Sequence, residues 1–183
     1  MARRLVGTLL LVIAAGAIDP LGACGDKYLN LGLGTRYHWS AKERRAAAIL
    51  IYAAPNSELS RLLASLSVED AMKKAGYQPT FASSGNQLDA ALRTRTWDVV
   101  VVDGGDTDAV GPRLRKAPRA PQVLPVLTRA TKEEVKRAEK AYDVVLKAPS
   151  RNRVFVDGVD DAMDVHAFEM AEAARAAKRS TRE

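Results

Sequence analysis

Cysteine, histidine and aromatic residues are all scarce in this sequence. Of its 183 residues one is a cysteine, Cys24, two are histidines and 5% are aromatic. A single cysteine excludes an internal disulfide and a zinc site built on paired cysteines. The histidines, His38 and His166, stand far apart with no partner beside them, so no Ser/His/Asp or Cys/His catalytic arrangement is predicted. We therefore expect no enzymatic activity, no cofactor and no metal site.

Neither sign of charge dominates the chain. It has 28 Lys and Arg against 22 Asp and Glu, which gives a formal net charge of +6. Such an excess can favour anionic membranes or nucleic acid. No compact basic helix with interleaved aromatic residues is present, so a nucleic-acid partner is not expected. Apolar residues make up 47% of the chain, enough for a core built mostly from Val, Leu, Ile and Ala.

The first residues have the pattern of an export signal. Arg3 and Arg4 precede an uncharged, mostly apolar run over residues 5–18. This run is shorter than the about 20 residues that a membrane-spanning helix needs, and it fits the apolar part of a signal peptide. Residues 21–24, Leu-Gly-Ala-Cys, resemble the lipobox of bacterial lipoproteins. The resemblance implies cleavage before Cys24 and a diacylglycerol on its thiol.

This interpretation makes residues 1–23 a signal peptide and residues 24–45 a lipidated cysteine with its tether. The protein would then be exported and lipid-anchored at the bacterial cell envelope, on the periplasmic side or the surface. Its partners would be the membrane and an unknown protein. Three alternatives remain open: ordinary secretion after cleavage near residues 15–17, an uncleaved anchor, and a buried N-terminal helix of a cytosolic domain.

Short apolar runs alternate with helical patterns over residues 46–170, which we assign to one domain followed by a basic C-terminal tail at 171–183. Five buried strands are predicted at 46–53, 77–83, 97–103, 123–128 and 143–147. Helices are predicted over 58–75, 86–95, 132–142 and 155–178, with a break considered in the last near Asp164, while residues 104–120 leave little room for a helix. The alternation predicts an α/β fold with a five-stranded parallel sheet in a three-layer, flavodoxin-like sandwich.

The ends of three predicted strands resemble those of the receiver domain of two-component response regulators, over about residues 47–165. The valine run that ends at Asp103 is similar to the receiver strand that ends in the phospho-accepting aspartate. Thr128 and Lys147 end the next two strands, where receivers have a hydroxyl residue and an invariant lysine. The resemblance implies a receiver-like sandwich in which Asp103 and Lys147 form a salt bridge.

The residues with which a receiver holds Mg²⁺ are missing. Receivers carry an acidic pair just after the first strand, and the matching positions here are Ala53 and Ala54. Alanine offers no oxygen to the ion that neutralises a transferred phosphoryl group. We therefore expect a degenerate receiver that acts as a noncatalytic binding or scaffolding domain. The alternatives are a phospho-accepting receiver on an N-terminal membrane anchor, and an exported small-ligand-binding protein or enzyme.

Overall fold

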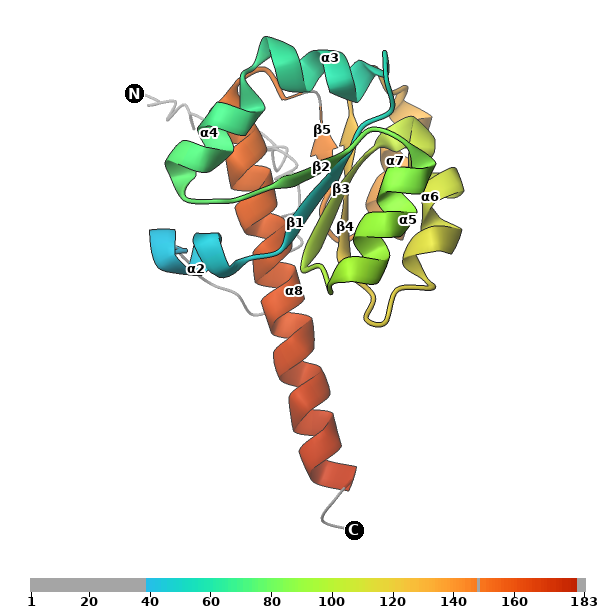
Figure 1. The fold of residues 1–183 in the computed structure, drawn as a ribbon. Helices are drawn as coiled ribbons and strands as arrows, with labels where there is room; N and C mark the ends of the chain where they lie inside the picture. Colours follow the sequence, from blue (N-terminus) through green and yellow to red (C-terminus); the bar gives the residue numbers. More distant parts are fainter. Residues whose placement is uncertain (1–38, 148, 181–183) are drawn as a thin grey trace, which may run out of the picture. The chain divides into compact units, whose positions relative to one another are not determined.

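The computed structural model describes residues 39–147 and 149–180, so the predicted signal peptide and Cys24 lie outside the described residues. Within these residues five strands form one parallel sheet (Figure 1). In chain order the strands are β1 (Ile49–Tyr52), β2 (Thr80–Ala82), β3 (Val99–Asp103), β4 (Gln122–Leu127) and β5 (Leu146–Lys147). Their order across the sheet is β2-β1-β3-β4-β5, which reverses between β1 and β3. The prediction of a five-stranded parallel sheet is confirmed, and the order is the flavodoxin-like one.

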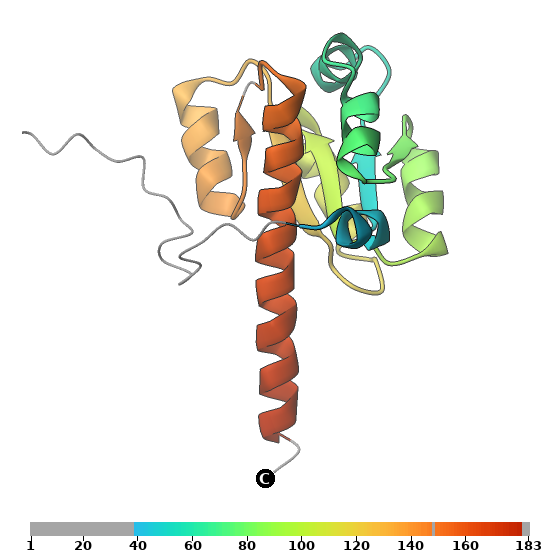
Figure 2. The same cartoon turned by 90° about the vertical axis from the view of Figure 1, so that its left-hand side faces the viewer.

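Helices cover both faces of this sheet. They are α2 (Ala41–Ala46), α3 (Glu58–Ser65), α4 (Val68–Ala75), α5 (Gly85–Thr94), α6 (Thr107–Leu114), α7 (Lys132–Ala141) and α8 (Asn152–Ser180), with a short 3-10 turn, η1 (Gly104–Asp106), before α6. Figure 1 shows α5, α6 and α7 on one side of the sheet and α2, α4 and α8 on the other, and Figure 2 views the domain from the side of α8. This is the three-layer α/β sandwich that the sequence predicts.

The two central strands have no exposed side. The apolar residues 49–51 of β1 and the four valines 99–102 of β3 are each 0% exposed. Leu50, Val100 and Val102 pack against one cluster of buried side chains from α5, α6 and the loop before β3, namely Leu88, Leu92, Trp97, Val110 and Leu114. A continuous apolar run is stable as a strand only where both faces are covered, which is why the valine run lies in the middle of the sheet.

One predicted helix is interrupted in the structure. The helix predicted over 58–75 is two helices, because Ser67 between α3 and α4 has a left-handed backbone with φ of 47°. Periodicity hides this break, since both helices bury apolar side chains. Gly76 ends α4 as predicted, with φ of 102°, and a Cβ there would lie 3.1 Å from the Cα atom of Ala41.

The loop predicted over residues 104–120 contains a helix, α6, which holds Gly111 and Pro112. Val110 and Leu114 of α6 are buried in the core, and their burial outweighs the poor helix propensity of glycine and proline in so short a helix. The last helix, α8, runs unbroken past Asp164 and takes in the predicted basic tail as far as Ser180. No helix in residues 39–147 and 149–180 is both long and apolar enough to cross a bilayer.

A partly buried carboxylate, that of Asp160, fastens α2 to α8. Asp160 accepts hydrogen bonds from Arg44 Nε at 3.1 Å and Nη2 at 2.6 Å, and from the hydroxyl of Tyr77. Burial, followed by the hydrogen bond to Asp160, raises the pKa of Tyr77 far above its usual range. Trp39 adds a second link, because its Nε1 donates to Asp164 at 2.7 Å. The chain just before β1 is therefore part of the folded domain.

Replacing Asp160 with alanine should loosen this link. Arg44 and Tyr77 would both lose their acceptor, and breaking a largely buried ion pair costs about 3 kcal/mol. We expect the free energy of unfolding in urea to fall by about 2–3 kcal/mol. Asp157→Ala is the matched control. Its carboxylate forms an exposed ion pair with Arg153 Nε at 3.9 Å, and the loss of this pair should cost less than about 0.5 kcal/mol. Equal losses in the two variants would show that the link does not carry this stability.

Candidate functional site

Three of the predicted site residues end neighbouring parallel strands, yet the structure brings only two of them into one pocket. Asp103 at the end of β3 and Thr128 just after β4 line a pocket of about 450 Å³. Lys147, at the end of β5, is not among its lining residues. Ala53, just after β1, lines a different pocket beside α3, α4 and β2. Of the three predicted strand-end residues, Asp103 and Thr128 therefore share a pocket and Lys147 does not line it.

The Asp103 carboxylate is bonded to two backbone amides. Its Oδ2 accepts from the amide of Leu59 at 2.9 Å, and its Oδ1 accepts from the amide of Gly105 at 3.2 Å. Leu59 is the second residue of α3, where the first backbone N–H groups of a helix have no partner within the helix. Asp103 therefore ties the end of β3 to the start of α3 and also holds the turn that follows β3.

The neighbouring Asp106 experiences the charge of Asp103. Partial burial is the main cause that raises the pKa of Asp106, and the negative charge of Asp103 adds to it. The negative charge of Asp103 therefore disfavours the ionised form of Asp106. A cation from β5 would relieve this repulsion, and in a receiver the lysine occupies that place.

The predicted salt bridge between Asp103 and Lys147 is wrong. Lys147 Nζ donates instead to Glu139 Oε1 of α7 at 2.7 Å. The reason is the alternation of side chains along β5. Leu146 is buried and lies close to Gly158 of α8, so Lys147 points to the opposite side of the sheet, where α7 lies. Half of the Lys147 side chain, 54%, is exposed, so this is a surface ion pair.

The positions of the receiver's acidic pair hold no ligand atoms. Ala53 uses its backbone N–H to donate to the carbonyl of Ala82 at 3.0 Å, and the side chains of Ala53 and Ala54 are methyl groups. Within residues 39–147 and 149–180, no group of three or more His, Cys, Asp or Glu side chains is placed to hold a metal ion.

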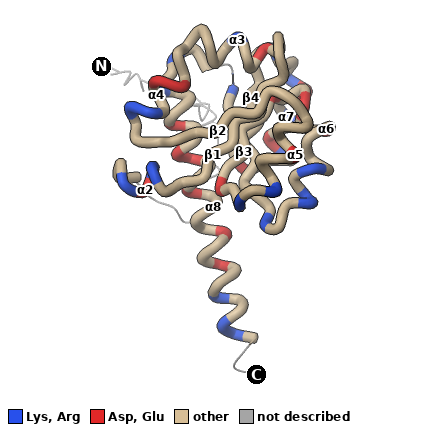
Figure 3. Tube along the Cα trace, in the orientation of Figure 1, with Lys and Arg blue, Asp and Glu red and all other residues tan. Residues whose placement is uncertain are grey.

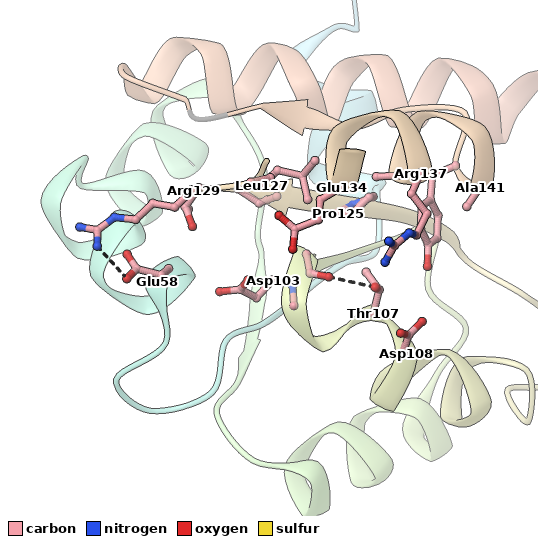
Figure 4. A pocket seen from close by; sticks show the side chains of 17 residues that line it. Glu58, Asp103, Thr107, Asp108, Pro125, Leu127, Arg129, Glu134, Arg137 and Ala141 are labelled. Atoms are coloured by element: carbon pink, nitrogen blue, oxygen red, sulfur yellow. Dashed lines mark hydrogen bonds and ion pairs between the residues drawn. The ribbon is translucent and has the colours of Figure 1, made fainter. Parts of the chain in front are cut away.

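The pocket at the ends of β3 and β4 carries both signs of charge. Figure 4 shows Glu134 and Arg137 reaching into it from α7, opposite Asp103, Thr107 and Asp108. At the other end of the pocket, Arg129 Nη1 lies 3.5 Å from Glu58 Oε1. The backbone of Gly104 packs against the side chain of Leu127 here, so closely that a Cβ at position 104 would collide with that side chain. These residues could hold a small polar molecule by hydrogen bonds and ion pairs.

His166, which the sequence suggests is isolated, is buried and belongs to a partly exposed polar cluster at the other end of the strands, near the start of β3. Its Nε2 is 3.4 Å from Asp98 Oδ1 and contacts a guanidinium nitrogen of Arg119. The hydrogen bond with His166, together with that from the amide of Ala48 and the charge of Arg119, holds the pKa of Asp98 below its usual value. Asp98 stands 68 positions before His166 in the sequence, so no local pattern could reveal the cluster.

A double-mutant cycle on Asp103 and Lys147 tests this geometry. Asp103→Ala leaves the amide of Leu59 without its acceptor and should lower the free energy of unfolding by about 1–2 kcal/mol. Lys147→Ala removes an exposed ion pair and should cost less than about 0.5 kcal/mol. Because the two side chains do not meet, the coupling energy should stay below about 0.5 kcal/mol. A coupling above about 1 kcal/mol in urea unfolding would restore the salt bridge that the resemblance implies.

Comparison with known proteins supports the fold. No protein-family model and no curated protein matches this chain. A crystal structure of a response regulator from Thermotoga maritima superposes with a TM-score of 0.50 and 18% sequence identity, covering 64% of this chain and 98% of that one. At this identity the likeness shows the fold alone. The described part of the chain therefore has the receiver-like α/β fold, with the same order of strands as the flavodoxin-like sheet described above.

Proposed function

We propose that this protein is a noncatalytic binding or scaffolding domain with a receiver-like fold, held at a bacterial cell envelope by a lipid on Cys24. The observation that carries the proposal is the arrangement at the end of β3. Asp103 accepts hydrogen bonds from the amides of Leu59 and Gly105, and Lys147 is paired with Glu139 of α7. The Asp103 carboxylate thus holds the start of α3 and the turn after β3, and Lys147 is directed toward α7 and away from Asp103.

The chemistry of aspartyl phosphorylation supports this view. A phosphoryl group moves to a carboxylate only where cations neutralise the charge that develops on its oxygens. A receiver supplies Mg²⁺ through its acidic pair and an ammonium group through its lysine. With Ala53 and Ala54 in place of the pair and Lys147 turned to Glu139, neither cation is provided beside Asp103. The fold then serves to present surfaces to a partner.

Export and lipidation rest on the sequence of residues 1–24, with Arg3 and Arg4, the apolar run and the Leu-Gly-Ala-Cys box. A diacylated cysteine with a further acyl chain anchors a protein stably, whereas a single chain does so only marginally. In this location the domain would meet neither a cytoplasmic kinase nor much phosphoryl donor, in keeping with a noncatalytic role.

The pocket beside Asp103 favours a second candidate, an exported small-ligand-binding protein. Its volume of about 450 Å³ suits a small molecule, and Asp108, Glu134 and Arg137 offer it charges of both signs. A small molecule that remains with the protein through purification and is released by denaturation would favour this candidate over a purely scaffolding role.

One mass-spectrometric experiment tests both parts of the proposal. The protein is purified from the membranes of its natural host and incubated with Mg²⁺ and acetyl phosphate before its intact mass is measured. We expect a chain that begins at a lipid-modified Cys24 and gains no phosphoryl group. An intact Met1 would contradict the lipid anchor, and a phosphoryl group that maps to Asp103 would contradict the noncatalytic role. The Asp103→Asn variant is the control for phosphorylation at other sites.

A further inference from the structure

A group of basic side chains gathers where α5 and α6 end. Arg93 of α5 and Arg113 of α6 line one pocket of about 720 Å³ together with Lys116, two residues after α6. Arg115 stands beside them on the same turn and is exposed. Figure 3 shows these basic segments together at the lower ends of α5 and α6. We call the surface formed by Arg93, Arg113, Arg115 and Lys116 the basic surface.

Most of this charge is not neutralised within the domain. Arg113 pairs with Asp89, an ion pair that also holds α6 against α5. Within residues 39–147 and 149–180, Arg93, Arg115 and Lys116 have no carboxylate within 4.0 Å. Asp89, the acidic residue that lines this pocket, is the partner of Arg113, and Asp106 and Asp108 stand at the start of α6, away from its end. The basic surface therefore keeps an excess of positive charge.

The rest of the pocket between these cations is mostly apolar. Apart from Asp89, which pairs with Arg113, its remaining lining consists of Leu92, Ala109, Pro112, Ala117 and Pro118. Cations around an apolar floor suit an amphipathic anion, such as the phosphate and glycerol portion of a phospholipid. Free phosphate would use the cations alone and would gain nothing from the apolar floor.

The same surface is poorly suited to nucleic acid. Proteins that bind single strands stack bases on exposed aromatic rings, and those that bind duplexes present a helix or ribbon to a groove. The aromatic residue nearest this surface in the chain is Trp97, which is 3% exposed and has the guanidinium of Arg95 stacked 4.8 Å from its ring centre. The ring is therefore closed to a base.

We propose that the basic surface at the ends of α5 and α6 docks the domain on anionic phospholipid headgroups. The inference rests on the membrane location given above as the proposed function. A tethered domain meets headgroups at high local concentration, so a modest attraction is enough to hold it against the bilayer. Each Lys or Arg near an anionic membrane adds to this attraction, which weakens as salt screens it. The pocket with Asp103 and Asp108 at the ends of β3 and β4 then faces away from the membrane, toward a partner.

Vesicle co-sedimentation tests the inference with the mature chain, residues 24–183, carrying Cys24→Ser, so that neither the apolar run 5–18 nor an attached lipid binds the vesicles. Vesicles of equal parts phosphatidylglycerol and phosphatidylcholine are compared with vesicles of phosphatidylcholine alone. The test variant is Arg93→Glu with Lys116→Glu, which spares Arg113 because that residue also holds α6. The control is Lys136→Glu with Lys140→Glu, which makes the same change of charge on two exposed lysines of α7. Thermal unfolding confirms that each variant is folded.

We expect binding to the phosphatidylglycerol vesicles that is lost at high salt and that falls by at least about 30-fold in the Arg93/Lys116 variant. The Lys136/Lys140 variant should bind nearly as well as the parent chain. An equal loss in both variants would overturn the inference, because net charge alone would then account for binding. Equal binding to both kinds of vesicle, or displacement of the protein from vesicles by duplex DNA, would overturn it as well. None of these outcomes depends on lipidation at Cys24, so the inference can fail while the anchor stands.

Discussion

The carboxylate at the end of β3 is the interaction on which the candidate site depends. By accepting hydrogen bonds from the amides of Leu59 and Gly105, Asp103 fixes the start of α3 and the turn into α6 with a single side chain. It stands at the point where the strand order reverses, which in such sheets is the usual place for a ligand. A group engaged in this way shapes the end of the sheet, and this arrangement is the basis of the noncatalytic role proposed above.

The sheet could be predicted from the sequence because burial acts locally. The four valines 99–102 and the apolar run around Ile49 are so uniformly apolar that only a strand covered on both faces accommodates them. The position of Asp103 at the end of β3 followed from the same pattern, and the apolar run predicted over 123–128 placed Thr128 just after β4. Gly76 was likewise predictable, since the end of α4 needs a left-handed residue.

The rest depended on contacts between distant segments. Lys147 pairs with Glu139 because the burial of Leu146 decides which way β5 turns its side chains, and a two-residue strand gives no such signal in the sequence. The helix α6 forms despite Pro112 because Val110 and Leu114 meet a core that other segments build. His166 contacts Asp98 and Arg119 because α8 packs across the sheet, which brings together segments that are far apart in the sequence. The convergence of Arg93 with Lys116 is of the same kind.

The central claim is that Asp103 acts as a structural acceptor for α3. Amide hydrogen exchange at Leu59, measured by NMR in the parent chain and in Asp103→Ala, tests it most directly. The account predicts that the Leu59 amide is protected in the parent chain and loses much of that protection in the variant, while the amide of Ser60, which is bonded to Ser57, changes little. Unchanged protection at Leu59 would show that the carboxylate does not hold the helix, and would leave Asp103 available for chemistry.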